Sequence, residues 1–332
     1  MYLIFIQIVY AILSTLILLN YSHFLGKKFN LIDKPNKNNI HKKDVPLIGG
    51  IVLLNLFIST EIFLYLWDIL KIRIFLSLLF STILFFIIGF FDDLKNLSGS
   101  KRTLLFFLAS LFFLYMSGIY TDLTKIFFVT YKNSVNMGLW GLFFFTLCLV
   151  GLQIVFNLID GINGLLKIYF ISSLIILDLY VQNNIGLMIK ILLIPFFIML
   201  IFNFQNKFFL GSSGNSILSL ITAYVLFVNL SNQNVLIYFE QIFLLFLIPF
   251  TDCLRLFIYR LVKFKNIFIK QKNHLHHYLI KKYSITKTLF VYFFISFLPS
   301  IIYYLFQFNI YIIIFFTLIS YFILLNFLNK AT

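Results

Sequence analysis

Charge is scarce in this sequence: Asp, Glu, Lys and Arg together make up 11% of its 332 residues. A soluble domain of this length needs far more charge to cover its surface, so the composition excludes an ordinary water-soluble protein. Cysteine is scarce as well. Cys148 and Cys253 are the two present, and both fall in or beside apolar runs, so neither a disulfide nor a cysteine zinc site is expected. The chain also lacks internal repeats, low-complexity linkers and a separate soluble segment, so we expect one domain covering residues 1–332.

Long apolar runs are abundant instead. Hydrophobic residues make up 61% of the chain, and its mean hydropathy is +1.00. A membrane-spanning helix needs about 20 mostly apolar residues. We therefore expect an all-α, polytopic integral membrane protein with about eleven transmembrane helices. The predicted spans are 3–20, 47–67, 74–91, 103–119, 137–156, 166–181, 185–202, 213–230, 235–250, 288–305 and 310–327.

The distribution of basic residues predicts the orientation. The gaps after the odd-numbered spans hold or border 20 Lys and Arg, whereas the gaps after the even-numbered spans hold 4. Because basic residues are enriched on the cytoplasmic side of membranes, we expect the N-terminus outside and the C-terminus in the cytoplasm. The cytoplasmic loops are then about 21–46, 92–102, 157–165, 203–212 and 251–287. The net charge of +15 follows from the same bias, so no nucleic-acid partner is expected.

Unusual polar side chains gather in these loops. All 5 histidines lie there. Asp92, Asp93 and Asp160 stand directly against apolar spans, where an ionisable group is costly unless it serves a site or finds a partner. General polarity of loops does not explain that placement.

Two acidic segments favour a metal site linked to phosphate. In GFFDDLKNLSGSKR (89–102), adjacent carboxylates repel each other unless a cation lies between them and an anionic ligand. Mg²⁺ bound through one or two carboxylates and substrate phosphates meets that need, whereas a solvated helix end is the simpler alternative for this segment alone. In NLIDGINGL (157–165), Asn157, Asp160 and Asn163 are three apart, so a partly helical turn places them on one side.

Two other segments carry the remaining polar motifs. In HKKDVPLIGG (41–50), which begins at His41, Pro and Gly shape the entry into the second span. The loop at 249–279 is rich in basic residues and ends in a histidine cluster. These histidines are His274, His276 and His277. A His-x-His-His group can bind zinc, but no cysteine or second ligand pair accompanies it. Cationic side chains beside imidazoles suit a nucleotide diphosphate better.

Taken together and in this order, the four segments resemble the polyprenyl-phosphate N-acetylhexosamine-1-phosphate transferases, glycosyltransferase family 4. The resemblance runs from about Leu31 to Leu279 and includes the spacing of the spans. It implies an all-helical membrane fold whose active site faces the cytoplasm. It also implies transfer of a sugar 1-phosphate from a UDP-sugar to a polyprenyl phosphate such as undecaprenyl phosphate, with UMP as the second product and Mg²⁺, or Mn²⁺, as cofactor.

One branch of the family is more similar than the other. The VPLIGG segment and the His-Leu-His-His group resemble the branch that transfers GlcNAc 1-phosphate or related amino sugars. That branch starts cell-surface polysaccharides such as O-antigen, common antigen, teichoic-acid linkage units and capsules. The phospho-MurNAc-pentapeptide branch usually has three consecutive histidines. A UDP-N-acetylhexosamine substrate and a bacterial inner-membrane location are implied, and a homodimer is left open.

The resemblance also assigns site residues. Asp92, Asp93 and Asp160 match the family's catalytic acids and metal ligands, and Asn157 precedes the last of them as the family expects. Other polar positions of the family imply substrate-binding residues. These are His41, Asn157, Lys207, Asp252, Arg255, His274, His276 and His277.

The clearest departure from the family lies in FLGSSGNS (209–216). The family has F-x-G-D-x-G-S there, with the Asp as a magnesium ligand, and this chain has Ser212 in its place. A third Asp that commonly follows the acidic pair is Asn96 here, and an Asp that often precedes the histidines is Gln271. A weaker metal site is therefore expected.

Two alternatives to the transferase follow from these features. A family member that lost catalysis through Ser212 would hold a lipid carrier or a partner. A transporter would place ionisable residues in mid-membrane positions, for which Glu61, Asp178 and Glu240 are the candidates. Because those three do not pair across apparent repeats, the transferase is the favoured hypothesis.

Overall fold

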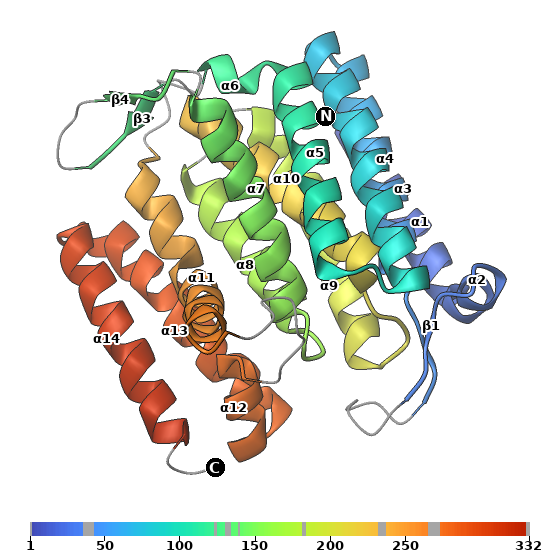
Figure 1. Ribbon diagram of the computed structural model, residues 1–332. Coiled ribbons are helices and arrows are strands. Elements are labelled where there is room, and N and C mark those ends of the chain that lie inside the picture. The colour runs from blue at the N-terminus through green and yellow to red at the C-terminus, as the bar shows by residue number, and fades with distance from the viewer. Residues whose placement is uncertain are drawn as a thin grey trace.

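The computed structural model describes residues 2–35, 43–122, 125–129, 134–138, 140–180, 184–231, 237–264 and 273–329. These residues form a bundle of long helices (Figure 1). The N-terminus lies toward the upper end of the bundle in this view and the C-terminus at the lower end.

The elements follow the predicted runs closely. The helices are α1 (Tyr2–Asn20), α2 (Ser22–Lys28), α3 (Gly49–Leu66), α4 (Ile72–Lys95), α5 (Gly99–Ser117), α6 (Ile119–Asp122), α7 (Trp140–Ile159), α8 (Leu165–Tyr180), α9 (Asn184–Phe204), α10 (Gly211–Ser231), α11 (Phe239–Val262), α12 (Leu275–Lys282), α13 (Ile285–Phe306) and α14 (Ile310–Asn329). Two short antiparallel pairs complete the described part. They are β1 (Ile32–Asp33) with β2 (Val45–Pro46), and β3 (Lys125–Phe127) with β4 (Ser134–Asn136).

The expectation of an all-α polytopic membrane protein is confirmed. Within the described residues, 9 helices are long and apolar enough to cross a membrane. They are α1, α3, α4, α7, α9, α10, α11, α13 and α14. The other two predicted spans, 103–119 and 166–181, also form helices, α5 and α8, which pack beside α4 and α9 respectively.

Helix α10 occupies the centre of the bundle, packed against α3, α4 and α7 (Figure 1). It carries many hydroxyl side chains for a helix in that position. Their donors are satisfied locally, because Ser219 and Thr222 donate to backbone carbonyls of the preceding turn, at 2.7 and 2.8 Å. Such bonds keep polar groups paired where no water can reach them.

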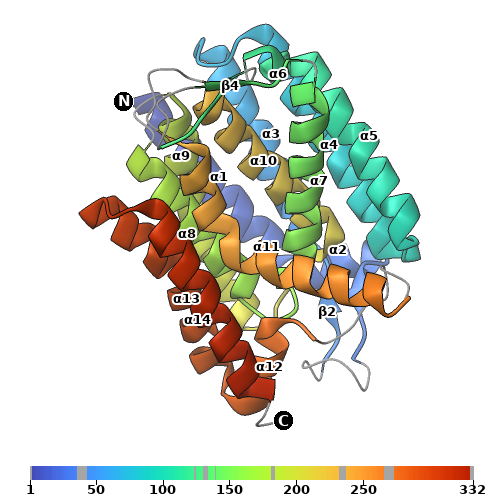
Figure 2. The same ribbon diagram turned by 60° about the vertical axis from the view of Figure 1, so that its left-hand side comes forward.

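Helix α11 continues beyond the predicted span 235–250, to Val262. Pro249 lies inside it and has no backbone N–H to donate to the preceding turn, which favours a kink. Figure 2 shows α11 turning partway along, so that its second half runs across the bundle. The start of the long predicted loop at 251–287 is therefore helical, and Asp252 and Arg255 project from a rigid element.

One end of the bundle gathers most of the polar segments. In Figure 1, α2, β1, α12 and the C-terminus lie at the lower end, whereas α6, β3 and β4 lie at the upper end. Asp92 and Asp93 close the lower end of α4, and α10 begins at that same end. The alternation of spans predicted from the basic residues thus brings the polar motifs to one face.

Candidate active site

Asp93 binds the first turn of α10. Its Oδ1 accepts a hydrogen bond from the backbone N–H of Ser212 at 2.7 Å. Its Oδ2 accepts bonds from the N–H and the Oγ–H of Ser213, at 3.1 and 2.7 Å. A helix N-terminus carries partial positive charge and unpaired N–H groups, so the carboxylate caps α10. Asp93 therefore fixes the position of α10, and a metal-binding role for it stays a prediction.

Asp92 is 6% exposed and binds two donors through one oxygen. Its Oδ2 accepts hydrogen bonds from Ser212 Oγ at 2.6 Å and from Arg102 Nη1 at 2.9 Å. Arg102 comes from α5, and its charge compensates that of the buried carboxylate. Ser212, which stands where the family has Asp, thus contacts both acids of the pair.

Asp160 meets α10 through Asn215. The Asn215 Nδ2 group donates to Asn157 Oδ1 and to Asp160 Oδ2, both at 3.1 Å. The structure leaves two buried polar atoms here without a partner among the described residues, Asn157 Nδ2 and Asn215 Oδ1. Unsatisfied buried donors and acceptors are rare, so they point to a bound ligand at this place.

Lys167 is a buried cation that the sequence argument did not single out. It lies in the first turn of α8 and is 2% exposed. Burial raises the pKa of Asp160, and the nearby Lys167 ammonium lowers it. The sequence did contain a sign of this residue, because Lys167 follows NLIDGINGL by two residues and lies inside an apolar span, where a lysine is unusual.

The Gly-Gly pair after Pro46 allows a close backbone contact with the chain entering α10. Phe209 donates to the Pro46 carbonyl at 2.9 Å, and Gly49 donates to the Phe209 carbonyl at 3.0 Å. A Cβ at Gly50 would lie 2.5 Å from Ser213 Cβ, so a side chain there would displace the first turn of α10. The VPLIGG motif therefore positions the serines that bind the acid pair.

Asn203 fixes the loop that carries Asp160. Its Oδ1 accepts from the N–H of Gly164 at 2.7 Å, and its Nδ2 donates to the Phe208 carbonyl at 2.9 Å. Gly164 has a φ of 83°, a conformation that favours glycine. Asn163 donates to Asn206 on the same turn. The turn-forming residues thus tie the 157–165 loop to the end of α9.

The histidine cluster is organised by Asp252 on α11. Its Oδ2 lies 3.0 Å from His274 Nδ1 and accepts from the Leu275 N–H at 3.1 Å. Its Oδ1 accepts from Arg255 at 2.9 Å and from the Tyr321 hydroxyl at 2.7 Å. Asp252 thus joins α11, α12 and α14 and orients His274. Tyr321 could not be found from the sequence, because it lies in a span far along the chain.

The two clusters meet at Gly161. A Cβ at Gly161 would lie 2.7 Å from His276 Nε2, so the Asp160 loop and the histidines are in contact. The ring centroids of His276 and His277 are 4.2 Å apart. Burial and the neighbouring histidines lower the pKa of His276 well below its usual value, so this imidazole is neutral near pH 7. His276 therefore presents a neutral imidazole beside the Asp160 loop.

Most of the predicted site residues are thus brought together. Those in the two joined clusters are Asp92, Asp93, Asn157, Asp160, Ser212, Asp252, Arg255, His274, His276 and His277. His41 lies outside the described residues. Lys207 is exposed, with its Nζ 4.7 Å from the centroid of the Phe202 ring, and it makes no hydrogen bond to either cluster in the described part of the chain.

Asp92 and Asp160 are the acids assigned to the predicted magnesium site. Among the described residues, no three His, Cys, Asp or Glu side chains form a group that could hold a metal. Asp92 and Asp160 nevertheless lie at the first turns of α10, and Asn215 Oδ1 is a buried acceptor without a partner. Mg²⁺ needs only one or two carboxylates when substrate phosphates and water complete its shell. A magnesium ion at these oxygens, completed by a phosphate ligand, stays a prediction.

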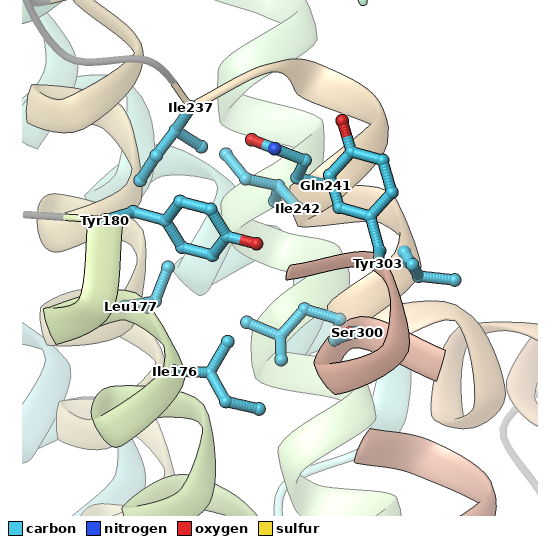
Figure 3. A pocket seen from close by; sticks show the side chains of 10 residues that line it. Ile176, Leu177, Tyr180, Ile237, Gln241, Ile242, Ser300 and Tyr303 are labelled. Carbon is cyan, nitrogen blue, oxygen red and sulfur yellow. The ribbon is translucent and has the colours of Figure 1, made fainter. Parts of the chain in front are cut away.

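A separate hollow lies at the other end of α8 (Figure 3). It is lined mainly by apolar side chains of α8, α11 and α13, with Tyr180, Gln241, Ser300 and Tyr303 as its polar members. Its volume is about 10 Å³, room for a single water molecule. It is too small for a sugar nucleotide.

Comparison with known proteins agrees with this arrangement. Residues 75–230 match the family described as Glycosyl transferase family 4. An undecaprenyl-phosphate alpha-N-acetylglucosaminyl 1-phosphate transferase of Thermotoga maritima is 29% identical over 80% of this chain and 78% of its own length. A phospho-N-acetylmuramoyl-pentapeptide-transferase of Petrotoga mobilis is 27% identical over 81% of this chain and 85% of its own length.

Further relatives extend the match. The undecaprenyl-phosphate alpha-N-acetylglucosaminyl 1-phosphate transferase of Escherichia coli O157:H7 is 25% identical over 84% of this chain and 77% of its own length. A relative in Saccharolobus solfataricus is matched over 43% of this chain and 41% of its own length. The matched region 75–230 contains Asp92, Asp93, Asn157, Asp160 and the first turn of α10, the residues that converge in the structure. Over residues 75–230, and over most of its length in these relatives, the chain is therefore similar to glycosyl transferase family 4.

Proposed function

We propose that this protein transfers an N-acetylhexosamine 1-phosphate from a UDP-sugar to a polyprenyl phosphate, giving a lipid diphosphate sugar and UMP. One observation carries the proposal. Three carboxylates from two separate motifs converge on the first turns of α10, at the polar end of a membrane bundle, in a chain that matches a sugar-transferase family. Transferases that act on undecaprenyl phosphate are among its relatives over most of its length.

The reaction is a phosphoryl transfer. An oxygen of the lipid phosphate attacks the phosphorus that bears the sugar, and the bond from that phosphorus to the bridging oxygen breaks. UMP leaves with the bridging oxygen and its electron pair. A phosphate with a second pKa of about 6 is already largely dianionic at pH 7, so the attack needs no general base. The protein's tasks are to hold two anions together and to neutralise the charge on the leaving phosphate.

The residues divide these tasks between the two clusters. Asp92 and Asp160 would hold Mg²⁺, which when bound supplies positive charge to the diphosphate. Arg102 holds the Asp92 carboxylate in an ion pair. Asp93 binds the first turn of α10 and so fixes the position of this helix relative to Asp92 and Asp160. Asp252, Arg255 and the histidines form the edge of the site that we assign to the nucleotide sugar.

The lipid substrate agrees with the position of the site. The acids close helices that end at the polar face of the bundle, where the phosphate of a membrane-embedded lipid lies. The 20-to-4 bias in Lys and Arg supports a cytoplasmic orientation of this face and hence access to UDP-sugars. Relatives from bacteria support an inner-membrane location.

The test is direct. Purified protein would be incubated with undecaprenyl phosphate and, separately, UDP-GlcNAc, UDP-GalNAc and UDP-MurNAc-pentapeptide. Mg²⁺ would be in large excess, because a weak metal site is expected. Release of UMP with one of these donors, abolished in Asp160→Asn, is the expected result. Failure of every donor to release UMP would favour the alternative of a catalytically impaired carrier-binding protein.

A further inference from the structure

Lys167 has an unusual environment for a lysine. Its side chain is 2% exposed, yet it makes no hydrogen bond to any described residue. Its nearest described partners are the carboxylate of Asp160, which feels its charge, and the face of the Phe208 ring, whose centroid is 5.6 Å from Nζ. An ammonium group has three donors to satisfy.

A buried cation without acceptors destabilises a protein, because the ammonium loses its hydration and gains little in return. The Asp160 carboxylate offsets only part of that loss. Two neighbouring buried atoms, Asn157 Nδ2 and Asn215 Oδ1, also have no partner. Two of these three groups, the Lys167 ammonium and Asn157 Nδ2, are donors, and they come from the last turn of α7 and the first turn of α8, on either side of Asp160 in the sequence. These two donors form a partly built site for an anion beside Asp160, whereas the acceptor Asn215 Oδ1 suits a donor or a cation.

The charges around the site point the same way. Asp92 is paired with Arg102, and Asp93 is bound by the first turn of α10. Ser212 is neutral where the family pattern has an acid, so this site holds one negative charge fewer and Lys167 adds one positive charge. A site with Ser at 212 and Lys at 167 attracts a phosphate more strongly than a site with acids at 92, 93, 160 and 212 and no lysine. It attracts a divalent cation less strongly.

We propose that Lys167 binds a phosphate group of the substrates directly, and that this chain thereby carries within its own fold part of the positive charge that a metal ion supplies. The inference rests on the proposed transferase function and deepens it. The shared chemistry is a phosphate oxygen, which either the UDP-sugar or the polyprenyl phosphate can supply. Such a residue allows the substrates to bind without a divalent metal ion. A site of carboxylates alone would repel their phosphates under that condition.

The test measures binding without metal. UDP-GlcNAc and uridine would be titrated into detergent-solubilised protein in EDTA, and affinities compared for the wild type, Lys167→Met and Lys167→Arg. We expect Lys167→Met to weaken UDP-GlcNAc binding by about tenfold or more, as the loss of a charge-assisted hydrogen bond does. Uridine, which has no phosphate, should bind unchanged. Lys167→Arg should retain most of the affinity.

Lys190→Met is the matched control, since it removes an exposed lysine from the helix that follows α8. It should leave both affinities unchanged. Because Lys167→Met also leaves Asp160 without its cation, the double variant Lys167→Met/Asp160→Asn removes both charges and should fold. It too should lose UDP-GlcNAc affinity in EDTA while keeping that for uridine.

A second arm identifies the phosphate. With Mg²⁺ in the same large excess, KM would be measured separately for UDP-GlcNAc and for undecaprenyl phosphate, in the wild type and in Lys167→Met. A higher KM of Lys167→Met for UDP-GlcNAc assigns Lys167 to the donor diphosphate. A higher KM for undecaprenyl phosphate assigns it to the acceptor phosphate. If wild type turns over while Lys167→Met has unchanged affinity in EDTA and unchanged KM for both substrates, Lys167 merely neutralises Asp160 and the inference is wrong. If the wild type neither binds nor turns over any donor, the proposed function itself has failed.

Discussion

Ser212→Asp restores the acid of the family motif, and the structure predicts what this substitution does. Ser212 Oγ donates a hydrogen bond of 2.6 Å to Asp92 Oδ2. An aspartate at this position cannot donate and brings a second negative charge against Asp92. We therefore expect the variant to be less stable than the wild type without metal, and to bind Mg²⁺ more tightly.

The size of the effect follows from the contacts. The lost hydrogen bond to a carboxylate contributes about 2 kcal/mol. Two unit charges about 4 Å apart repel by up to about 4 kcal/mol at the effective dielectric constant near a protein surface. Arg102 binds the same oxygen of Asp92 and offsets part of that repulsion. A net loss of about 2–4 kcal/mol in EDTA is expected, and a bound divalent ion should remove most of it.

Two measurements follow from this estimate. Thermal unfolding in EDTA and across a Mg²⁺ series should show a variant that melts below the wild type without metal and gains more from added metal. In the UMP-release assay, Ser212→Asp should lower the Mg²⁺ concentration for half-maximal rate by about tenfold or more, since every 1.4 kcal/mol of binding energy is tenfold. Ser212→Asn, the neutral isostere, should show neither change. Equal melting temperatures in EDTA and equal Mg²⁺ dependence for Asp and wild type would refute the assignment of Ser212 to the metal site.

Three other predictions concern the remaining parts of the site. Asp160→Asn should lower kcat for UMP release by about a hundredfold or more, because it removes charge stabilisation worth several kcal/mol; near-normal turnover would exclude this acid from the chemistry. Asp252→Asn should raise KM for the UDP-sugar more than it lowers kcat, since the variant loses the bond that orients His274, and an equal fall in kcat would place the histidines at the reacting phosphorus. In a cysteine-free background, cysteines at Lys28 and Lys281 should resist impermeant thiol reagents in intact cells while one at Asp68 labels; the reverse pattern would contradict the orientation.

The fold was largely predictable because its signal is local. Each predicted span is a run of apolar residues, and each became a helix, although α5 and α8 are not among the 9 described helices long and apolar enough to cross a membrane. The error at α11 has a physical reason. Its predicted span ended where hydropathy falls after Phe250, but the helix continues past Pro249 as an amphipathic segment, with Asp252 and Arg260 buried and Phe257 exposed. Hydropathy averaged over a window does not detect such a segment.

The candidate site was predictable where a motif is short and its residues act within one turn. Asp92, Asp93 and Asp160 were identified because acids beside apolar runs are conspicuous in a membrane sequence. Asn215 and Tyr321 were missed, since an amide and a phenol are ordinary residues until their partners are known. Lys167 was counted with the basic residues that set the orientation, and its burial beside Asp160 showed its second significance.

The sequence by itself determined that this chain is a multi-span membrane protein, because hydropathy acts residue by residue along the chain. From the placement of charge it also predicts the orientation and the loops that carry the polar motifs. Only the tertiary structure decided which polar groups meet. Asp93 binds Ser212 and Ser213 across 119 and 120 residues of sequence, and Asp252 binds Tyr321 across 69. Such contacts depend on how the helices pack side by side, and packing is set by the shapes of whole surfaces rather than by any local pattern.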